Sequence, residues 1–159
     1  MAQPAAHHPF VRDLARALRR RCGVSEGDRL LVAVSGGGDS VALVRALAAL
    51  APRARWRLQL AVGHVQHGWR KEAEDEARFV EALAGRLNLP FFRRDLAKAS
   101  EATTGEAAGN REASARRQRY AALAHIAEQW QARAIVTAHH ADDQLETLLM
   151  RLLRGSGVR

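Results

Sequence analysis

The sequence predicts an α/β domain in which helices cover both faces of a doubly wound parallel sheet. Short apolar runs rich in branched residues alternate along the chain with segments of helical periodicity, which is typical of such a sheet. Hydrophobic residues make up 47% of the 159 residues, enough for a buried core. Because this length suits one domain, we expect residues 1–159 to form a single domain.

The expected elements follow from periodicity and from the residues that end them. A first helix is predicted over residues 10–22, where apolar side chains recur at helical spacing before Gly23. Apolar runs predict four strands, over residues 29–35, 58–65, 89–96 and 134–138. Apolar stripes predict four more helices, over residues 41–50, 71–87, 111–131 and 141–153. Residues 97–110 are small and polar and predict a loop.

The end of the sequence does not complete a sheet of this class. RLLRGSGVR stops at a predicted turn with no strand after it, and four strands make a thin doubly wound sheet. We therefore expect the sequence to be part of a longer chain.

Net charge, cysteine content and the length of apolar runs limit the kinds of partner and the cellular compartment that we expect. With 25 basic and 17 acidic residues the net charge is +8, which favours a polyanion such as RNA, although a basic protein without such a partner fits equally well. Cys22 is the single cysteine, so an intrachain disulfide and a CxxC metal or iron–sulfur site are excluded. No apolar run reaches the roughly 18 residues of a membrane span, and the N-terminus does not look like a signal peptide. We expect a cytoplasmic protein without a membrane partner.

A run of three glycines separates the first predicted strand from the helix that follows it. Residues 35–40 read SGGGDS, at the carboxyl edge of the predicted sheet. Successive glycines let backbone N–H groups converge on an anion, and the helix N-terminus adds partial positive charge. A plain strand-to-helix turn is the alternative, but such a turn needs only one glycine. The absence of a following lysine excludes a Walker A loop, and GGGDSV does not match GxGxxG.

The SGGGDS segment resembles the SGGxDS signature of the PP-loop ATP pyrophosphatases, whose domain is Rossmann-like and of the adenine nucleotide alpha hydrolase type. The resemblance implies that ATP binds here and is split between its α and β phosphates. The ATP-binding residues would be Ser35, Gly36, Gly37, Gly38, Asp39 and Ser40. A carboxylate among phosphate-binding groups is repelled by phosphate unless a cation intervenes, so we expect Asp39 to bind Mg²⁺.

Three further segments narrow the resemblance. HVQHGWR begins at His64, ARRQRY begins at Ala115, and HHADDQLETLLMRLLR begins at His139. Together with SGGGDS, and in this order, they are similar to the N-terminal domain of the tRNA(Ile)-lysidine synthetase family, from about Leu30 to Gly157. That family adenylates the wobble cytidine of isoleucine tRNA with a CAU anticodon, and free L-lysine then displaces AMP. Its C-terminal tRNA-binding domains are absent from this sequence.

The resemblance also implies roles for residues near the end of the sequence. His139, Asp143 and Glu146 are spaced to share one face of the predicted last helix. Asp143 and Glu146 would hold the substrate lysine as catalytic carboxylates, and His139 would contact the adenylate. Asp39 would be catalytic too, by helping these carboxylates or by binding Mg²⁺. The alternative is a solvated first turn, where acidic residues are common.

Arginines on the predicted long helix complete the expected site. Arg116 would stabilise charge on the adenylated intermediate or the leaving phosphate. Arg111, Arg117 and Arg119 would bind tRNA phosphates, although a solvated helix face explains these three equally well.

One histidine pair and His140 remain without a settled role. His64 and His67 form an HxxH pair, but residues three apart on a strand point to opposite faces. We therefore interpret them as polar residues that hold the loop or contact substrate, and assign no role to His140.

Three alternative functions stay open. A second kind of PP-loop enzyme, such as a tRNA thiolase or an amidotransferase synthetase domain, shares the glycine loop. A metal-dependent phosphohydrolase built on HHADD would leave SGGGDS unexplained. A non-catalytic RNA-binding fragment would account for the charge alone.

Overall fold

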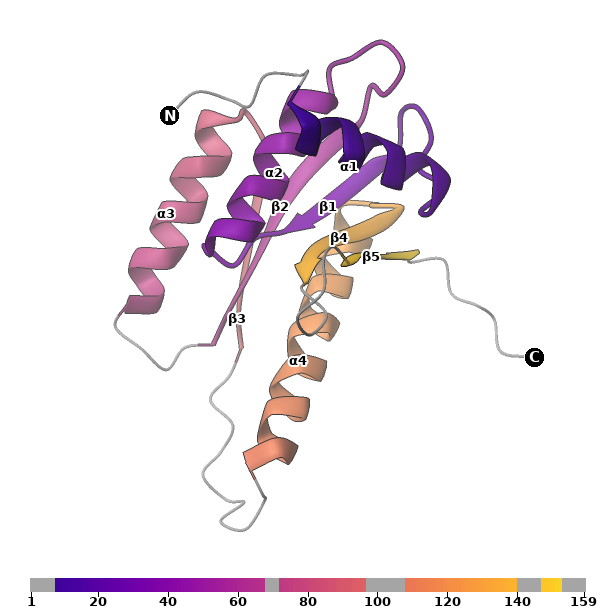
Figure 1. Cartoon of the computed structure of the whole chain (residues 1–159). Coiled ribbons are helices and arrows are strands. Elements are labelled where there is room, and N and C mark those ends of the chain that lie inside the picture. The colour runs from indigo at the N-terminus through magenta and orange to yellow at the C-terminus, as the bar shows by residue number, and fades with distance from the viewer. Residues whose placement is uncertain (1–7, 68–71, 97–107, 140–146, 153–159) are drawn as a thin grey trace, which may run out of the picture.

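A computed structural model describes residues 8–67, 72–96, 108–139 and 147–152 (Figure 1). The helices in this part of the chain are α1 (Pro9–Arg20), α2 (Gly38–Leu50), α3 (Glu72–Arg86) and α4 (Ala108–Gln129). The strands are β1 (Arg29–Ala33), β2 (Gln59–His67), β3 (Phe91–Leu96), β4 (Ala134–His139) and β5 (Thr147–Leu152).

The strands form one sheet in the order β3-β2-β1-β4-β5. The first four are parallel, with Val32 of β1 opposite Val62 of β2 and Val136 of β4. The chain steps outward from β1 to β2 and β3 through α2 and α3, and then returns through α4 to the other side of β1. This reversal of direction at β1 is the doubly wound topology that the sequence predicts.

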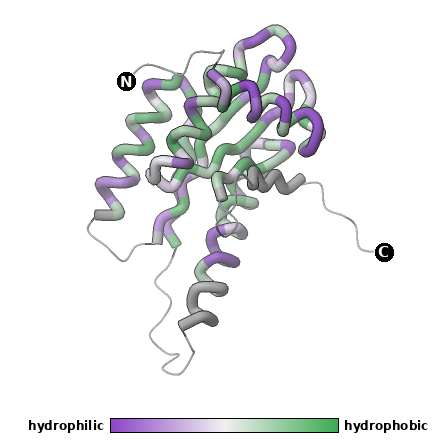
Figure 2. The backbone as a smooth tube through the Cα atoms, in the orientation of Figure 1, coloured by the Kyte–Doolittle hydropathy of each residue, from purple (hydrophilic) through white to green (hydrophobic). Residues whose placement is uncertain are grey.

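The two faces of the sheet are covered unequally. The larger core cluster joins buried residues of α1, α2 and α3, such as Leu18, Leu47 and Leu83, to the strands. The smaller cluster lies on the opposite face, where Ile126 of α4 packs with Leu31 and other strand residues. Figure 1 shows α4 apart from the other three helices, and Figure 2 shows the hydrophobic strands between the layers.

Local sequence explains why these segments adopt their structures. Leu30, Leu31 and Val32 are fully buried, so β1 is apolar on both faces, as expected of a central parallel strand. α1 starts with Pro9 in its first turn and carries Arg19 and Arg20 in its last turn, where positive charge stabilises a helix. These two elements confirm the sequence prediction to within two residues at each end.

The predicted helix over residues 141–153 is wrong for the part that the structure describes. Thr147–Leu152 is strand β5, which pairs antiparallel with β4, with Leu149 opposite Thr137. Leu148, Leu149 and Met150 are consecutive apolar residues, and a short apolar run fits a strand as well as a helix. Pairing with β4 satisfies backbone groups along an otherwise open strand edge. Residues 140–146 lie outside the described ranges.

No helix among the described residues is long and apolar enough to cross a membrane.

Candidate functional site

The glycine loop lies where the winding of the sheet reverses. β1 and β4 are neighbours, but β1 leads into α2 on one face while β4 is reached from α4 on the other. Ligands of open α/β sheets bind at the carboxyl ends of the strands at such a point. The fold therefore puts residues 34–40 at the position expected of a ligand site.

The loop joins a left-handed glycine to the N-terminus of α2. Gly36 has a φ of +98°, which side-chain-bearing residues rarely adopt, and Gly37 is extended as the N-cap of α2. The Val41 amide donates to the Gly37 carbonyl at 3.1 Å. The amides of Gly38, Asp39 and Ser40 thus belong to the first turn, whose N–H groups have no acceptor within the helix. Their direction and the helix dipole suit an anion.

Ser40 organises the loop from within. Its side chain is buried, and its hydroxyl donates to the Gly37 carbonyl at 2.9 Å. The same oxygen accepts from the Ser35 amide at 3.2 Å and lies 3.3 Å from the Ser35 hydroxyl. The two serines that the sequence predicts as ATP ligands are therefore also bonded to the loop and to each other.

His64 supports the loop from the neighbouring strand. It is 2% exposed in β2, and its Nδ1 lies 2.7 Å from the Val34 carbonyl oxygen, directly before SGGGDS. This contact fits loop support, which is one of the two roles that the sequence left open for His64. Its ring stacks on Phe91 with centroids 6.4 Å apart. The buried His64 Nε2 has no hydrogen-bond partner among the described residues, and neither does Gln66 Oε1.

Asp39 is the acidic residue of the first turn of α2, and it is exposed. A carboxylate at this point lies beside the amides of the loop and stabilises the helix N-terminus. Its carboxylate oxygens are the kind of ligand that Mg²⁺ prefers. Among the described residues, no group of three or more acidic, histidine or cysteine side chains is placed to hold a metal ion.

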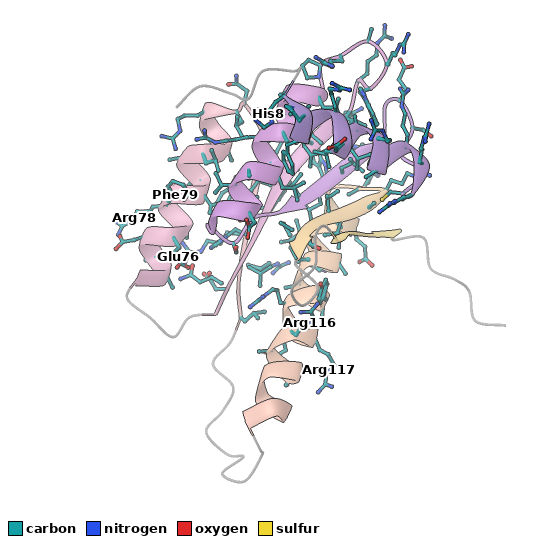
Figure 3. All side chains as sticks on the ribbon, in the orientation of Figure 1. His8, Glu76, Arg78, Phe79, Arg116 and Arg117 are labelled. Carbon is teal, nitrogen blue, oxygen red and sulfur yellow. The ribbon has the colours of Figure 1, made fainter. Side chains whose placement is uncertain are left out.

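The predicted arginines all lie on α4. Arg116 is exposed, with Nη2 3.5 Å from the Tyr120 hydroxyl and its guanidinium 5.4 Å from the centre of that ring. Arg117 and Arg119 are exposed as well. Figure 3 shows Arg116 and Arg117 on the part of α4 that extends beyond the sheet. Arg111 is in α4, but its side chain is outside the described part of the structure.

The remaining predicted residues are only partly described. His139 is the last residue of β4, so the prediction that it shares a helix face with Asp143 and Glu146 is wrong. Asp143, Glu146 and His140 lie outside the described residues. His67 ends β2, in the same strand as His64.

Sequence reasoning missed an ion-pair cluster at the carboxyl end of β3. Arg93 donates to both carboxylate oxygens of Glu74 on α3, at 2.9 and 2.7 Å, and to Asp95 at 2.7 Å. The hydrogen bond from Arg93 holds the pKa of Glu74 below its usual value, and the two carboxylates raise the pKa of Arg93. Arg93 lies opposite His64 in the sheet register. The charged residues of FFRRDL were the available signal, because charged side chains protect an edge strand from pairing with another chain.

Comparison with known families decides the class of this site. The PP-loop domain family matches residues 7–159. The chain belongs to the PP-loop domain family. The glycine loop described above lies within the matched residues, and the family is an ATP-binding one.

The names of the curated relatives are more specific than the description of the family. The tRNA(Ile)-lysidine synthase of Symbiobacterium thermophilum is 47% identical over 148 residues, which cover 91% of this chain and 30% of that protein. The enzyme of the same name from Synechococcus sp. is 41% identical, over 95% of this chain and 43% of that protein. That of Geobacter sulfurreducens is 48% identical, over 82% and 27%. The chain spans less than half the length of these relatives.

Solved structures agree on the fold alone. The U34-tRNA thiolase NcsA from Methanococcus maripaludis, solved with its [4Fe-4S] cluster, has a TM-score of 0.64 at 13% identity, covering 82% of this chain and 45% of that one. NMN synthetase from Francisella tularensis has a TM-score of 0.56 at 19% identity, covering 79% and 51%. Proteins with different names thus share this fold.

Proposed function

We propose that this chain is the ATP-binding catalytic domain of a tRNA(Ile)-lysidine synthase. The observation that carries the proposal is identity of 41–48% with three enzymes of that name over 82–95% of this chain. The glycine loop at the β1–β4 switch point supports it, because the reaction requires a site for pyrophosphate. We extend the proposal to residues 1–159 as one catalytic domain.

The proposed reaction has two steps. The 2-carbonyl oxygen of the wobble cytosine attacks the α-phosphorus of ATP, and pyrophosphate leaves. The ε-amine of free L-lysine, having lost a proton, then attacks C2 of the same base, and AMP departs with the oxygen. The product carries the lysine in place of that oxygen. Substrates are ATP, L-lysine and the CAU-anticodon isoleucine tRNA.

The loop would bind the phosphates that leave in the first step. The backbone amides of Gly36, Gly38 and Ser40 would donate hydrogen bonds to the pyrophosphate at a helix N-terminus. These donors are neutral, so the negative charge that develops on pyrophosphate would be stabilised without removing water from a charged side chain. Asp39 would hold Mg²⁺, which when bound would neutralise phosphate charge. The bonds within the loop keep it in this shape before the nucleotide arrives, so that little order has to be gained on binding.

The second step would use residues further along the chain. Asp143 and Glu146 would hold the lysine ammonium and His139 would contact the adenylate. Arg116 on α4 would offset negative charge on the departing AMP, and its exposure leaves it open to substrate. Arg111, Arg117 and Arg119 would bind tRNA phosphates, consistent with the net charge of +8.

The alternatives are weaker on specific grounds. NcsA was solved with a [4Fe-4S] cluster, which cysteines usually hold, and this sequence has only Cys22. The fold likeness to NcsA and NMN synthetase says nothing about substrate. A phosphohydrolase would not need the glycine loop, and a passive RNA-binding fragment would not need the loop or Asp39.

The test is AMP formation from ATP labelled at the α-phosphate, with L-lysine and an isoleucine tRNA transcript. We expect AMP with the CAU transcript and not with a UAU transcript as the matched control. Asp39→Ala should abolish AMP formation. Glu146→Ala should chiefly raise the lysine concentration needed, by about tenfold, because it removes a partner of a charged group. The proposal is wrong if AMP forms equally with the CAU and UAU transcripts, or if both variants form AMP at the parental rate.

A further inference from the structure

The peptide unit that starts the glycine loop is held at both ends by buried side chains. Its carbonyl, on Val34, receives the 2.7 Å contact from His64 Nδ1. Its amide, on Ser35, donates to Ser40 Oγ at 3.2 Å. Val34 is also tied to β2 through its own amide, which donates to the Gly63 carbonyl at 2.9 Å. The entry to the loop is therefore fixed by two neighbouring residues of β2 and by the first turn of α2.

The contact assigns the proton on the His64 ring. A carbonyl oxygen can only accept a hydrogen bond, so Nδ1 carries the hydrogen and donates. In the neutral ring Nε2 is then an acceptor, and it is buried without a partner among the described residues. An apolar side chain of similar size would stack on Phe91 without leaving a buried nitrogen unpaired. The Val34 bond is thus what a histidine supplies here that an apolar residue cannot.

We propose that His64 is a positioning residue for the pyrophosphate loop, acting through the Nδ1–H to Val34 bond. It touches no reacting atom. By fixing the Val34–Ser35 peptide, it sets the direction in which Gly36 and the first-turn amides point. The proposal rests on the proposed ATP-binding function and adds to it a residue outside the loop, from a strand 30 positions later.

Two substitutions separate the two nitrogens of the ring. The side-chain amide nitrogen of asparagine can occupy the position of Nδ1, whereas that of glutamine reaches the position of Nε2. His64→Asn therefore preserves a donor to Val34, and His64→Gln does not. His64→Leu removes both nitrogens but keeps an apolar side chain against Phe91. Asn and Gln have the same functional group, so this pair is matched in polarity.

The experiment measures the dissociation constants of inorganic pyrophosphate and of AMP by calorimetry for the parental chain and the three variants. We expect His64→Leu and His64→Gln to bind pyrophosphate about tenfold more weakly, the scale of one lost hydrogen bond. His64→Asn should stay close to the parental value. AMP affinity should change little in all three, because AMP lacks the phosphates that the loop would hold. This split between ligands is one that a general loss of folding would not produce.

Each contrary result would contradict either the positioning role of His64 or the proposed function. If His64→Gln binds pyrophosphate as the parent does and His64→Asn does not, the functional atom is Nε2 and the positioning role is wrong. Equal weakening of both ligands would make His64 a general stability residue. If His64→Leu binds pyrophosphate with the parental affinity, His64 has no positioning role, and the proposed ATP-binding function is unaffected. If the parental chain binds neither ligand, the proposed function fails and the role of His64 fails with it.

Discussion

The two ends of the parallel sheet organise polar groups in opposite ways. At the carboxyl end, Ser40 and His64 are buried, and they act through neutral hydrogen bonds to the loop backbone. At the amino end, arginines dominate. Arg19 stacks 4.5 Å from the Trp56 ring centre and donates to the Arg55 carbonyl, and Arg29 stacks 4.4 Å from that of Trp130.

The difference separates the stacked arginines of the amino end from the proposed pyrophosphate loop. The arginines of the amino end pack on aromatic rings, and Arg133 pairs with Asp28. The loop at the carboxyl end carries no basic side chain, and its positive potential comes from backbone amides and a helix dipole. We therefore expect pyrophosphate at the carboxyl end, although arginines gather at the other. The following substitutions test that expectation from the largest effect to the smallest.

Gly36→Ala should have the largest effect on ligand binding. The added Cβ has room, with Val80 and Glu76 atoms at 3.8 and 3.9 Å, but the φ of +98° is strained for alanine by about 1–3 kcal/mol. The loop should relax to another conformation, and pyrophosphate affinity measured by calorimetry should fall at least about tenfold. Gly23→Ala is the matched control, since Gly23 also has a positive φ, of +61°, and open space around it. Equal loss of affinity in both variants would contradict this reading.

Ser40→Ala should have the largest effect on stability among the hydroxyl substitutions. It leaves the Ser35 amide and the Gly37 carbonyl without their partner, and should lower the free energy of unfolding by about 1–3 kcal/mol. Urea denaturation of Ser40→Ala and Ser35→Ala makes the comparison. Ser35 is exposed, and its loss should lower stability by less than about 1 kcal/mol. A larger effect at Ser35 would show that the buried hydroxyl does not organise the loop.

Arg19→Ala should affect stability slightly and ligand binding not at all. An exposed arginine on a tryptophan contributes about 0.5–1 kcal/mol, so urea denaturation should show a loss of that size. Arg20→Ala, an exposed neighbour, is the control and should be close to parental. Weaker pyrophosphate binding by Arg19→Ala would mean that the amino end takes part in anion recognition.

Glu74→Gln should give the smallest effect, visible as a pH dependence. Arg93 lowers the pKa of Glu74, so the ionised carboxylate stabilises the fold at pH values above the unfolded pKa of this group. That stabilisation is lost as the pH falls through the lower, folded pKa. The difference in melting temperature between parent and variant should therefore be present at neutral pH and shrink as the pH falls through the folded pKa of Glu74, below the usual carboxyl range. Glu81→Gln, an exposed residue of the same helix, is the control. A difference that grew on acidification would have the wrong sign.

Elements with a local signal were predictable from the sequence, and contacts between distant residues were not. RLLVA is almost entirely apolar, which predicts a strand buried on both faces, and the glycines of SGGGDS predict a turn. Both could therefore be predicted from consecutive residues. α4 begins at Ala108, inside the predicted loop. The loop prediction extended too far because Ala108–Asn110 carry no apolar stripe, although they are helical. β5 was misassigned because strand pairing with β4, and not local spacing, sets its structure.

The site shows the same limit. The loop was predicted because its residues are consecutive, whereas the His64 bond to Val34 joins residues 30 apart and depends on strand register. Sequence reasoning offered loop support as one of two roles for His64, but could not assign the nitrogen. The ion pair between Arg93 and Glu74 likewise needs α3 to pack beside β3, which no spacing rule predicts.

The most direct test of the account is to titrate the isotopically labelled chain with pyrophosphate and follow every backbone amide by NMR. We expect saturable shifts concentrated at Gly36–Ser40 and at the flanking Val34 and His64, with little change around Arg19 and Trp56. Shifts centred on the arginines of the amino end, with the loop amides unmoved, would contradict it.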